Sequence, residues 1–373
     1  MKRICKDNNA IKIYMLPAGK GDFFIIQYID KMKEHFIFID GGDKSAAYIY
    51  KAALTWINKE NKCIDAIIFT HNDDDHICGA LCAIMATETL PEIGRIYITL
   101  GKEIEKRFQI KALQEYPESE KKEYLHSKNV QHSSRQAVTL EEYFKEIGLE
   151  DRIEGCVCMG DRILVGDAEI KIISPGLKQL ENYLNRWNQE IKDEKSGQHM
   201  SARKQNKLDL SCYVTQSVPK DTSVSNGSSI AFIFEHNGIK IAFLGDAYAD
   251  VCVEGISKFY PLSDTLKVDA VKISHHGSAH NYSDKLYQLL LTEHYLLSTQ
   301  GTTKHPSPVF LGKLFNQNKC ARILCNGSWM RDYGFSEGDL ARYLNKETPR
   351  IYQLEHKEYI SQGLILCGKF PDE

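Results

Sequence analysis

The stretch that indicates the fold most clearly reads THNDDDHICG, from Thr70 to Gly79. It places two imidazoles and three carboxylates within the six positions 71–76, directly after the apolar run of residues 64–69. A hydrophobic core has no use for these groups, whereas imidazole nitrogens and carboxylate oxygens are common ligands of divalent cations. We therefore predict a buried strand that ends in a metal-binding loop.

This one loop can serve two metals. In an extended segment alternate side chains point to the same side, so His71 and Asp73 can bind one cation. Asp75 and His76 stand where the chain turns into a helix, and they can bind a second cation nearby. The alternative interpretation is an acidic helix start, because Asp is a good N-cap. That interpretation would explain Asp75 but not a histidine at each end.

The composition is that of an ordinary globular protein, with 373 residues, 42% hydrophobic and 26% charged, and a net charge of -3. No overall basic field would attract nucleic acid, so an anionic substrate would be held locally, with Lys272 and Lys304 among the nearby cations. The eleven cysteines form no repeated CxxC pattern, the N-terminus lacks a signal peptide, and no apolar run approaches the ~18 residues of a membrane span. We therefore expect a cytoplasmic protein without a membrane contact.

Strands and helices alternate along the chain, which favours a layered α/β domain with helices outside the sheets. Expected strands cover residues 11–16, 23–28, 36–39, 63–70, 95–100 and short segments of 152–174. Expected helices cover residues 46–59, 76–86 and 177–192, and residues 229–235 and 240–244 predict a hairpin. We treat residues 1–373 as a single domain.

Two segments depart from this alternation. Residues 102–150 are highly charged, and their pattern predicts an inserted segment of two or three helices over one edge of the domain. Residues 194–225 are polar, and this composition predicts a mobile loop.

Three later motifs place further polar groups after apolar strands. Gly245-Asp246 ends the second strand of the hairpin, where the glycine permits a sharp turn. Residues 268–273 lead into His275-His276, again a strand that ends in imidazoles. His305 is a ligand, a proton donor or a phosphate contact, or else a structural residue before a proline-started helix, and the sequence favours neither interpretation.

Taken in this order, the motifs resemble those of the metallo-β-lactamase fold superfamily. Matches to its motifs are DGG at residues 40–42, the His-x-His-x-Asp-His segment at 71–76 with Asp73 at the second histidine, the bridging aspartate at Gly245-Asp246 and the late histidine at 275–276. The closest resemblance is to the metallo-β-lactamase-like domain of ComEC-type DNA-uptake proteins, through GKGD at 19–22, NGSSI at 226–230, HHGS at 275–278 and HP at 305–306. It covers residues 10–100 and 150–345 and implies a four-layer αββα sandwich, to which this chain adds its helical insertion.

The resemblance implies a metal-dependent hydrolase with two divalent cations, Zn²⁺ or Mn²⁺, and a bridging hydroxide as nucleophile. Asp246 would bridge the cations, and the choice between the two adjacent histidines stays open. The expected metal ligands are His71, Asp73, Asp75, His76, Asp246, His275 and His276. Asn226 occupies about the place of a further histidine ligand in the superfamily, and an oxygen ligand there would shift the preference toward manganese.

The expected reaction is phosphodiester cleavage in DNA, RNA or a nucleotide. Asp75 would orient the nucleophile, and His276 or His305 would contact a phosphate oxygen or protonate the leaving group. Asp40 is expected to bond the metal-binding loop and hold its ligands in orientation. The candidate substrate contacts are Ser278, Asn226 and Lys304.

Two alternatives stay open from the sequence. A small-molecule ester, lactone or phosphocholine-type hydrolase would use the same hydroxide, so the motifs do not fix the bond that is cut. A metal-stabilised subunit of a bacterial defence or regulatory complex would bind a protein partner through the helical insert. A scaffold without metal is disfavoured, because unpaired carboxylates at one site repel one another.

Overall fold

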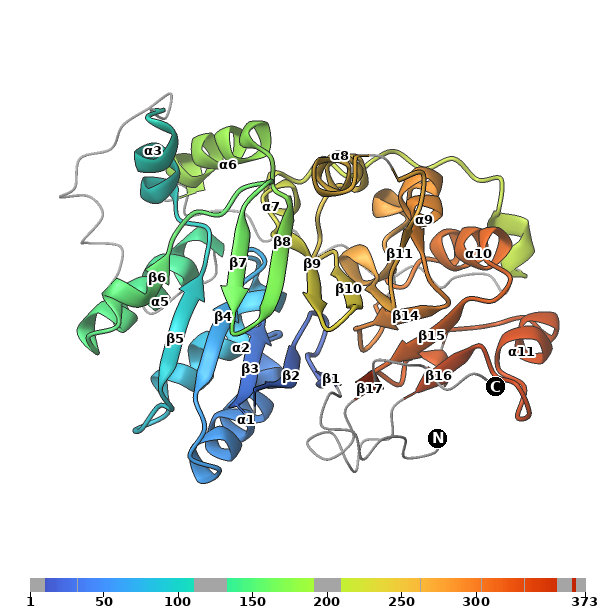
Figure 1. Ribbon diagram of the computed structural model, residues 1–373. Helices are drawn as coiled ribbons and strands as arrows, with labels where there is room; N and C mark the ends of the chain where they lie inside the picture. The colour runs from blue at the N-terminus through green and yellow to red at the C-terminus, as the bar shows by residue number, and fades with distance from the viewer. Residues whose placement is uncertain are drawn as a thin grey trace.

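The computed structural model describes residues 11–31, 33–110, 133–190, 209–261, 263–302, 304–331, 333–353 and 364–366. Two large β-sheets lie face to face, and helices cover the outer face of each sheet (Figure 1). The four-layer αββα sandwich that the sequence predicts is therefore confirmed.

The first sheet is built mainly by the N-terminal half of the chain. Its seven strands lie in the order β17-β1-β2-β3-β4-β5-β6. Strands β1 to β3 pair antiparallel, whereas β3 to β6 pair parallel through helical crossovers. The strands are β1 (Ile11–Met15), β2 (Phe24–Asp30), β3 (Lys33–Ile39), β4 (Ile64–Ile68), β5 (Ile93–Tyr97), β6 (Ile153–Glu154) and β17 (Leu364–Leu366).

The second sheet is built by the C-terminal half, in the order β16-β15-β14-β12-β10-β9-β8-β7. Strands β7 to β10 pair antiparallel, and β10 to β16 pair parallel. The strands are β7 (Arg162–Val165), β8 (Ala168–Ser174), β9 (Ala231–His236), β10 (Ile239–Phe243), β12 (Ala270–Lys272), β14 (His294–Leu297), β15 (Arg322–Cys325) and β16 (Ile351–Gln353). A separate short pair is formed by β11 (Leu266–Lys267) and β13 (Leu290–Leu291).

The helices form the two outer layers. Over the first sheet lie α1 (Ala47–Lys59), α2 (Asp74–Met85), α3 (Gly101–Phe108), α5 (Ser133–Glu146) and α6 (Leu177–Glu190). Over the second sheet lie α8 (Ala249–Phe259), α9 (Asp284–Leu289), α10 (Pro308–Gln317) and α11 (Glu337–Tyr343). Shorter helices are α7 (Val224–Gly227), η1 (Lys44–Ala46), η2 (Glu150–Arg152), η3 (Leu210–Tyr213), η4 (Ser274–Gly277), η5 (Ala279–Asn281) and η6 (Trp329–Arg331).

The central core lies between the two sheets, and its packing brings the carboxyl ends of strands from both sheets to one edge. Alternate strand residues point inward, so Phe24 of the first sheet meets Phe243 of the second with ring centroids 5.7 Å apart. Strands β3 and β4 of one sheet, and β10 and β12 of the other, have their carboxyl ends at the same edge of the sandwich, where Ile230 donates to the Thr70 carbonyl. The polar residues that follow these four strands therefore meet there.

The strands and helices expected from the sequence are present, with ends displaced by a few residues. Of the predicted insert, the described part contains α3, which packs on α6, and α5, which packs on α2. Residues 111–132 lie outside the described residues, and a protein partner for the insert stays a prediction.

The segment predicted as a mobile loop is anchored where the structure describes it. Residues 194–208 lie outside that part, but Leu210 is buried and its backbone N–H donates to Asp339 of α11 at 3.0 Å. The η3 turn packs on α10, and α7 follows it. The polar composition of residues 209–225 therefore reflects hydrogen bonding within the fold. No helix in the described part of the chain is long and apolar enough to cross a membrane.

Candidate metal centre

The metal-binding loop leaves β4 in an extended conformation and then enters α2. Asp73 has φ -70° and ψ 149°, and the helix begins at Asp74. The neighbouring turn at residues 40–42 contacts this helix through backbone, since the Gly41 N–H donates to the His76 carbonyl at 2.7 Å. A Cβ atom on Gly41 would lie 2.3 Å from the Ala80 side chain, so only glycine permits this approach.

Asp40 joins the loop to the helix. Its carboxylate accepts hydrogen bonds from the Thr70 backbone N–H at 2.7 Å, the Thr70 hydroxyl at 2.7 Å and His76 Nδ1 at 2.8 Å. The side chain is fully buried. These are the contacts expected of a residue that orients the ligands, although its effect on metal binding stays a prediction.

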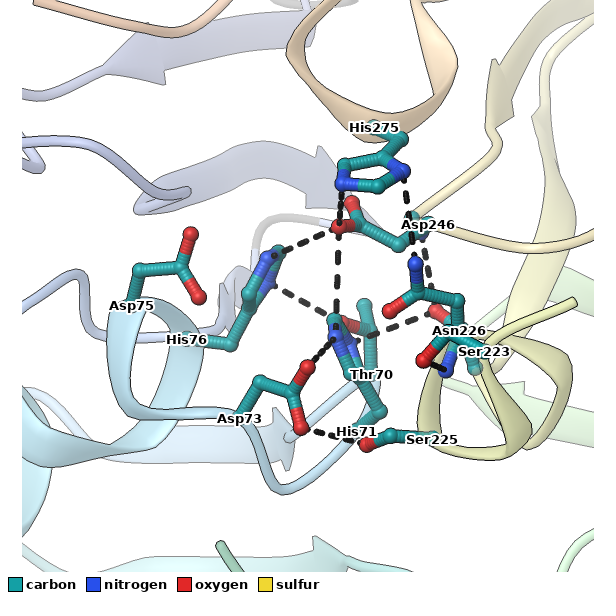
Figure 2. Close-up of polar contacts among 12 residues, drawn as sticks. Thr70, His71, Asp73, Asp75, His76, Ser223, Ser225, Asn226, Asp246 and His275 are labelled. Atoms are coloured by element: carbon teal, nitrogen blue, oxygen red, sulfur yellow. Dashed lines mark hydrogen bonds and ion pairs between the residues drawn. The ribbon is translucent and has the colours of Figure 1, made fainter. Parts of the chain in front are cut away.

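Four imidazoles surround one oxygen atom of Asp246. The Oδ2 atom of this carboxylate lies 3.5 Å from Nε2 of His76, 3.7 Å from Nε2 of His275 and of His276, and 3.9 Å from Nε2 of His71. Figure 2 shows three of these rings pointing at the carboxylate from different sides. Gly245, with φ +49°, makes the turn that presents Asp246 after β10.

The other ring nitrogen of each imidazole already has a partner. The Nδ1 atoms contact Thr70 Oγ1 at 3.2 Å for His71, Asp40 at 2.8 Å for His76, Asn281 Oδ1 at 2.9 Å for His275 and the Ser298 carbonyl at 2.9 Å for His276. In a neutral ring whose Nδ1–H donates, the lone pair is on Nε2, as a metal ligand requires. The Nε2 atoms of His71, His76 and His276 are buried without a hydrogen-bond partner among the described residues, and a cation would satisfy all three.

Two carboxylates divide these ligands into two groups. Asp73 Oδ2 lies 3.6 Å from His71 Nε2, and Asp75 Oδ2 lies 3.6 Å from His276 Nε2. The ring of His76 lies between these two groups, with its centroid 4.1 Å from that of His71 and 5.2 Å from that of His276. Donors about 2.1 Å from a tetrahedral cation lie about 3.4 Å from one another, and the observed separations are close to that value.

The adjacent histidines have different neighbours. His275 lies on the side of α7, where Asn226 Nδ2 is 3.3 Å from its Nδ1 and the Ser225 hydroxyl donates to Asp73. His276 lies with Asp75 and His76. The structure thus brings both histidines to the centre, each with Nε2 3.7 Å from Asp246 Oδ2, and the choice of metal ligand between them stays open.

The turn that contains His275 and His276 has an unusual backbone conformation. His275 has φ 47° and His276 has φ 51°, and Gly277 continues in the left-handed region with φ 79°. For a residue with a Cβ this region costs about 1–2 kcal/mol. The His275 N–H donates to the Gly245 carbonyl and the Ser307 N–H to the Gly277 carbonyl, both at 2.9 Å, which holds the turn in place.

The centre has a buried back and an open face. His276 is buried, and burial lowers its pKa to about 3, so the ring is neutral near pH 7. Burial alone would lower the pKa of His275, but the carboxylates of Asp246 and Asp221 outweigh it and raise the pKa to about 9. Asp73 and Asp75 each expose 34% of the side chain, so solvent and a substrate reach the centre from their side.

Behind the centre lies an ion pair that the sequence analysis did not predict. Asp22, at the end of the turn of residues 19–22, pairs with Lys272, and both are buried. Asp22 lies near Nδ1 of His276 (3.5 Å) and of His76 (4.0 Å), away from the converging Nε2 atoms. Asp22, His76, Asp246 and His276 could also group around a cation, because the salt bridge to Lys272 engages Asp22 Oδ2, whereas Asp22 Oδ1 is buried without a hydrogen-bond partner among the described residues. The expectation that Lys272 is a cation for substrate is wrong, because its side chain is 1% exposed.

The remaining predicted residues lie around the centre in different ways. His305 stacks near His275 with ring centroids 4.9 Å apart, and its Nδ1 is buried without a partner among the described residues. Lys304 is exposed beside it.

The Ser278 hydroxyl accepts from the His280 N–H at 3.3 Å and so begins η5, and Asn226 Nδ2 donates to Asp221 at 2.7 Å. Their roles toward substrate stay predictions.

Two residues that hold His275 were missed. Asp221 Oδ2 lies 3.3 Å from His275 Nδ1 and accepts from Asn281 Nδ2 at 3.2 Å. Both residues stand in polar segments without a strand or motif signal, so spacing alone could not have indicated them. Only the contact between the segment before α7 and η5 reveals the pair, where the Asp221 N–H also donates to the His280 carbonyl at 3.1 Å.

Four layers, with the centre at one edge of both sheets, define the fold. Solved structures of metallo-β-lactamase fold proteins are among those similar to this chain. Comparison with protein-family models and with curated proteins found no match. Similar solved structures include the metallo-β-lactamase fold protein YhfI from Bacillus subtilis, at 8% identity and a TM-score of 0.39, over 96% of this chain and 99% of that chain.

Two further similar structures are Zn(2+)-bound PqqB from Methylobacterium extorquens and the metallo-β-lactamase SMB-1. The first is 11% identical, with a TM-score of 0.40, over 96% of this chain and 99% of that chain. The second is 10% identical, with a TM-score of 0.28, over 72% of this chain and 82% of that chain. The closer resemblance to ComEC-type domains is not shown by these structures and stays a prediction.

Proposed function

We propose that this protein is a metal-dependent hydrolase that holds two divalent cations and cleaves phosphodiesters. The observation that carries the proposal is the convergence of four imidazole Nε2 atoms on one oxygen of Asp246, within 3.9 Å. Buried nitrogens without partners would be costly in a site that bound nothing. The centre is therefore built to hold cations.

Each cation would have two imidazole nitrogens and two carboxylate oxygens as protein ligands. The residues that would hold the first cation are His71, Asp73 and His275, those for the second are Asp75, His76 and His276, and Asp246 is shared. Mixed nitrogen and oxygen ligands suit both Zn²⁺ and Mn²⁺. When bound, the cations supply Lewis acidity toward a phosphoryl oxygen and lower the pKa of water.

The residues on the open face would act on water and substrate. Asp75 directs Oδ2 toward His276, and no hydrogen bond to its other oxygen is present among the described residues. That oxygen can accept a hydrogen bond from the attacking water and orient it. Burial lowers the pKa of His305 to about 3, so the neutral ring would donate a hydrogen bond to a phosphate or leaving-group oxygen.

The cation at the rim favours an anionic phosphodiester over a neutral lactone or ester. The ligand carboxylates Asp73, Asp75 and Asp246, together with a hydroxide, would balance the charge of a pair of divalent cations, and Asp22 behind them is neutralised by Lys272. Exposed Lys304, next to His305, adds a cation at the rim. An anionic substrate is therefore stabilised where negative charge grows during attack at phosphorus.

The test is hydrolysis by the purified protein loaded with Mn²⁺ or Zn²⁺. Substrates are bis-(p-nitrophenyl) phosphate, labelled single- and double-stranded DNA and RNA, together with a lactone and a phosphocholine ester. We expect cleavage of phosphodiesters, lost in Asp75→Ala. Cleavage of the lactone alone would reject the phosphodiesterase assignment and keep the hydrolase. Cleavage of the phosphocholine ester alone would replace a nucleic-acid or nucleotide substrate with another small-molecule phosphodiester.

The matched control is Asp74→Ala. Asp74 is the next carboxylate in the chain, but its Oδ1 accepts from Gln136 Nε2 of α5 at 2.7 Å, away from the centre. This variant should keep the activity and metal content of the wild type. Equal losses in both variants would mean that the helix start, and not the ligand, is responsible.

A further inference from the structure

Lys272 is a buried cation directly behind the shared carboxylate. It is the last residue of β12, and its side chain is 1% exposed. The ammonium pairs with the Asp22 carboxylate, donates to the Gly245 carbonyl at 3.0 Å and lies 3.8 Å from Asp246 Oδ1. A buried salt bridge is often no more stabilising than apolar residues of the same size, because desolvation of the two charges offsets their attraction. The buried pair of Lys272 and Asp22 is therefore weak evidence for a purely stabilising role.

The two oxygens of Asp246 have different surroundings. Oδ2 lies within 3.9 Å of four imidazole nitrogens, whereas Oδ1 faces Lys272 and has no hydrogen-bond partner among the described residues. Asp22 comes from the loop between β1 and β2 of the opposite sheet and fixes the ammonium. Lys272 thereby joins the turn of Gly245-Asp246 in one sheet to a loop of the other.

We infer that Lys272 is a positioning residue that holds Asp246 Oδ1 on the protein side, so that Oδ2 alone is shared between the two cations. The inference rests on the proposed metal centre. Lys272 contacts neither substrate nor the converging Nε2 atoms, so it acts through Asp246. Without it, the carboxylate can rotate and give one oxygen to each cation or both to one.

The direction in which metal affinity changes when Lys272 is replaced distinguishes a positioning role from a purely electrostatic one. A fixed positive charge repels a bound cation, so removing it without any other change would strengthen metal binding. Loss of the Asp246 orientation would weaken it, as substitutions behind metal ligands commonly do by 10–100-fold. A fall in metal affinity after the charge is removed therefore reports the lost orientation.

The experiment measures metal content of Lys272→Met after dialysis against buffered Mn²⁺ or Zn²⁺. Wild type should keep two equivalents, and the variant should bind the second with affinity lowered by about 10-fold or more. In the Mn²⁺ form, electron paramagnetic resonance should show the signal of a coupled pair in wild type and its loss in the variant. Thermal unfolding of the metal-free proteins checks that the variant is folded.

A double variant separates positioning from a merely structural ion pair. Asp22→Asn combined with Lys272→Met removes both charges, so no unpaired buried charge is left. If the pair only stabilised the fold, the double variant would regain wild-type metal content. We expect it to fold and to remain deficient in the second equivalent, because Asp246 still lacks its partner.

The matched control is Lys171→Met. Lys171 is also a nearly buried lysine on a strand of the second sheet, but it pairs with Glu235 and Glu169. This variant should keep two equivalents and the coupled signal. Wild-type affinity in Lys272→Met, or its recovery in the double variant, would overturn the inference alone. Fewer than two equivalents in wild type would overturn the proposed function as well.

Discussion

The two halves of the sandwich contribute the proposed metal ligands in opposite ways. The N-terminal half supplies His71, Asp73, Asp75 and His76 from one short loop with an ordinary extended backbone. The C-terminal half supplies its ligands from two turns, after β10 and β12, and each turn contains left-handed residues. In the first half local sequence creates the geometry, and in the second half tertiary contacts do.

The difference shows where the strain of the centre is stored. The backbone of Asp73 is relaxed, and the left-handed residue of the N-terminal half is Asp40, which lies behind the loop with φ 55°. In the C-terminal half His275 and His276 are themselves held in the left-handed region, by hydrogen bonds to Gly245 and, through Gly277, to Ser307. Such strain persists only when the surrounding structure fixes it. The C-terminal half should therefore be the more sensitive to changes behind its ligands.

Asp246→Asn should have the largest effect, because it alters the atom on which both groups converge. The amide lacks the charge of the carboxylate, so both cations should be lost and kcat/KM should fall by at least about 1000-fold. Metal analysis and hydrolysis of bis-(p-nitrophenyl) phosphate would measure this. Asp75→Asn, in the N-terminal half, should lose only one cation. Two bound cations in Asp246→Asn would contradict the shared position.

His275→Asn and His276→Asn should each remove one cation and lower kcat/KM by about 100-fold. Asn accepts left-handed backbone, so the turn should survive, but its side chain does not reach as far as Nε2. Absorption spectra of the Co²⁺ forms should differ between the two variants, since the cation lost is different. Identical spectra would place both histidines in one group.

A control for these two variants is His280→Asn. His280 is exposed, and its ring contacts the Pro219 carbonyl at 2.7 Å instead of the centre. Metal content and activity should equal those of wild type. This comparison tests whether the effect belongs to the ligands and not to the polar segment that contains them.

Asp40→Asn should have an intermediate effect on the N-terminal half. The amide cannot accept all three hydrogen bonds, so we expect metal affinity to fall by about 10-fold and the free energy of unfolding by about 2 kcal/mol. Isothermal titration with Zn²⁺ and chemical denaturation would measure these changes. Unchanged affinity together with lowered stability would limit Asp40 to a structural role.

His305→Ala should have the smallest effect. Its ring lies beside His275, with ring centroids 4.9 Å apart, and its Nδ1 has no hydrogen-bond partner among the described residues. We expect two bound cations and kcat/KM for a phosphodiester lowered by about 10-fold, in proportion to one lost hydrogen bond. A lost cation would show instead that His305 is a ligand.

Much of this architecture could be predicted from the sequence. Residues 70–79 combine the end of an apolar strand with a local run of ligands, and both signals survive in the structure because neither depends on distant contacts. Asp40 and Asp246 could be located because each follows a strand and a glycine stands beside it. The different directions of the His275 and His276 side chains could not be predicted from the sequence, because the backbone angles of a turn depend on the segments that pack against it.

The residues behind the ligands were the least predictable. Lys272 follows two apolar residues and has the appearance of a solvent-facing lysine in a strand, and only the position of Asp22 in the opposite sheet shows that it is buried. Asp221 lies in a segment whose composition predicted mobility. Pairs between distant segments leave no periodic pattern, so a single sequence cannot reveal them.

The glycine contacts have a consequence for recognising relatives that have lost activity. A Cβ atom at Gly21 would lie 1.5 Å from the Asp75 carbonyl, and one at Gly79 would lie 2.2 Å from the Gly41 carbonyl. These contacts between main chains shape the rim whether or not any imidazole is present. A descendant that had exchanged its histidines for other residues would still need these glycines, so their spacing is a better marker of shared ancestry than the catalytic motif.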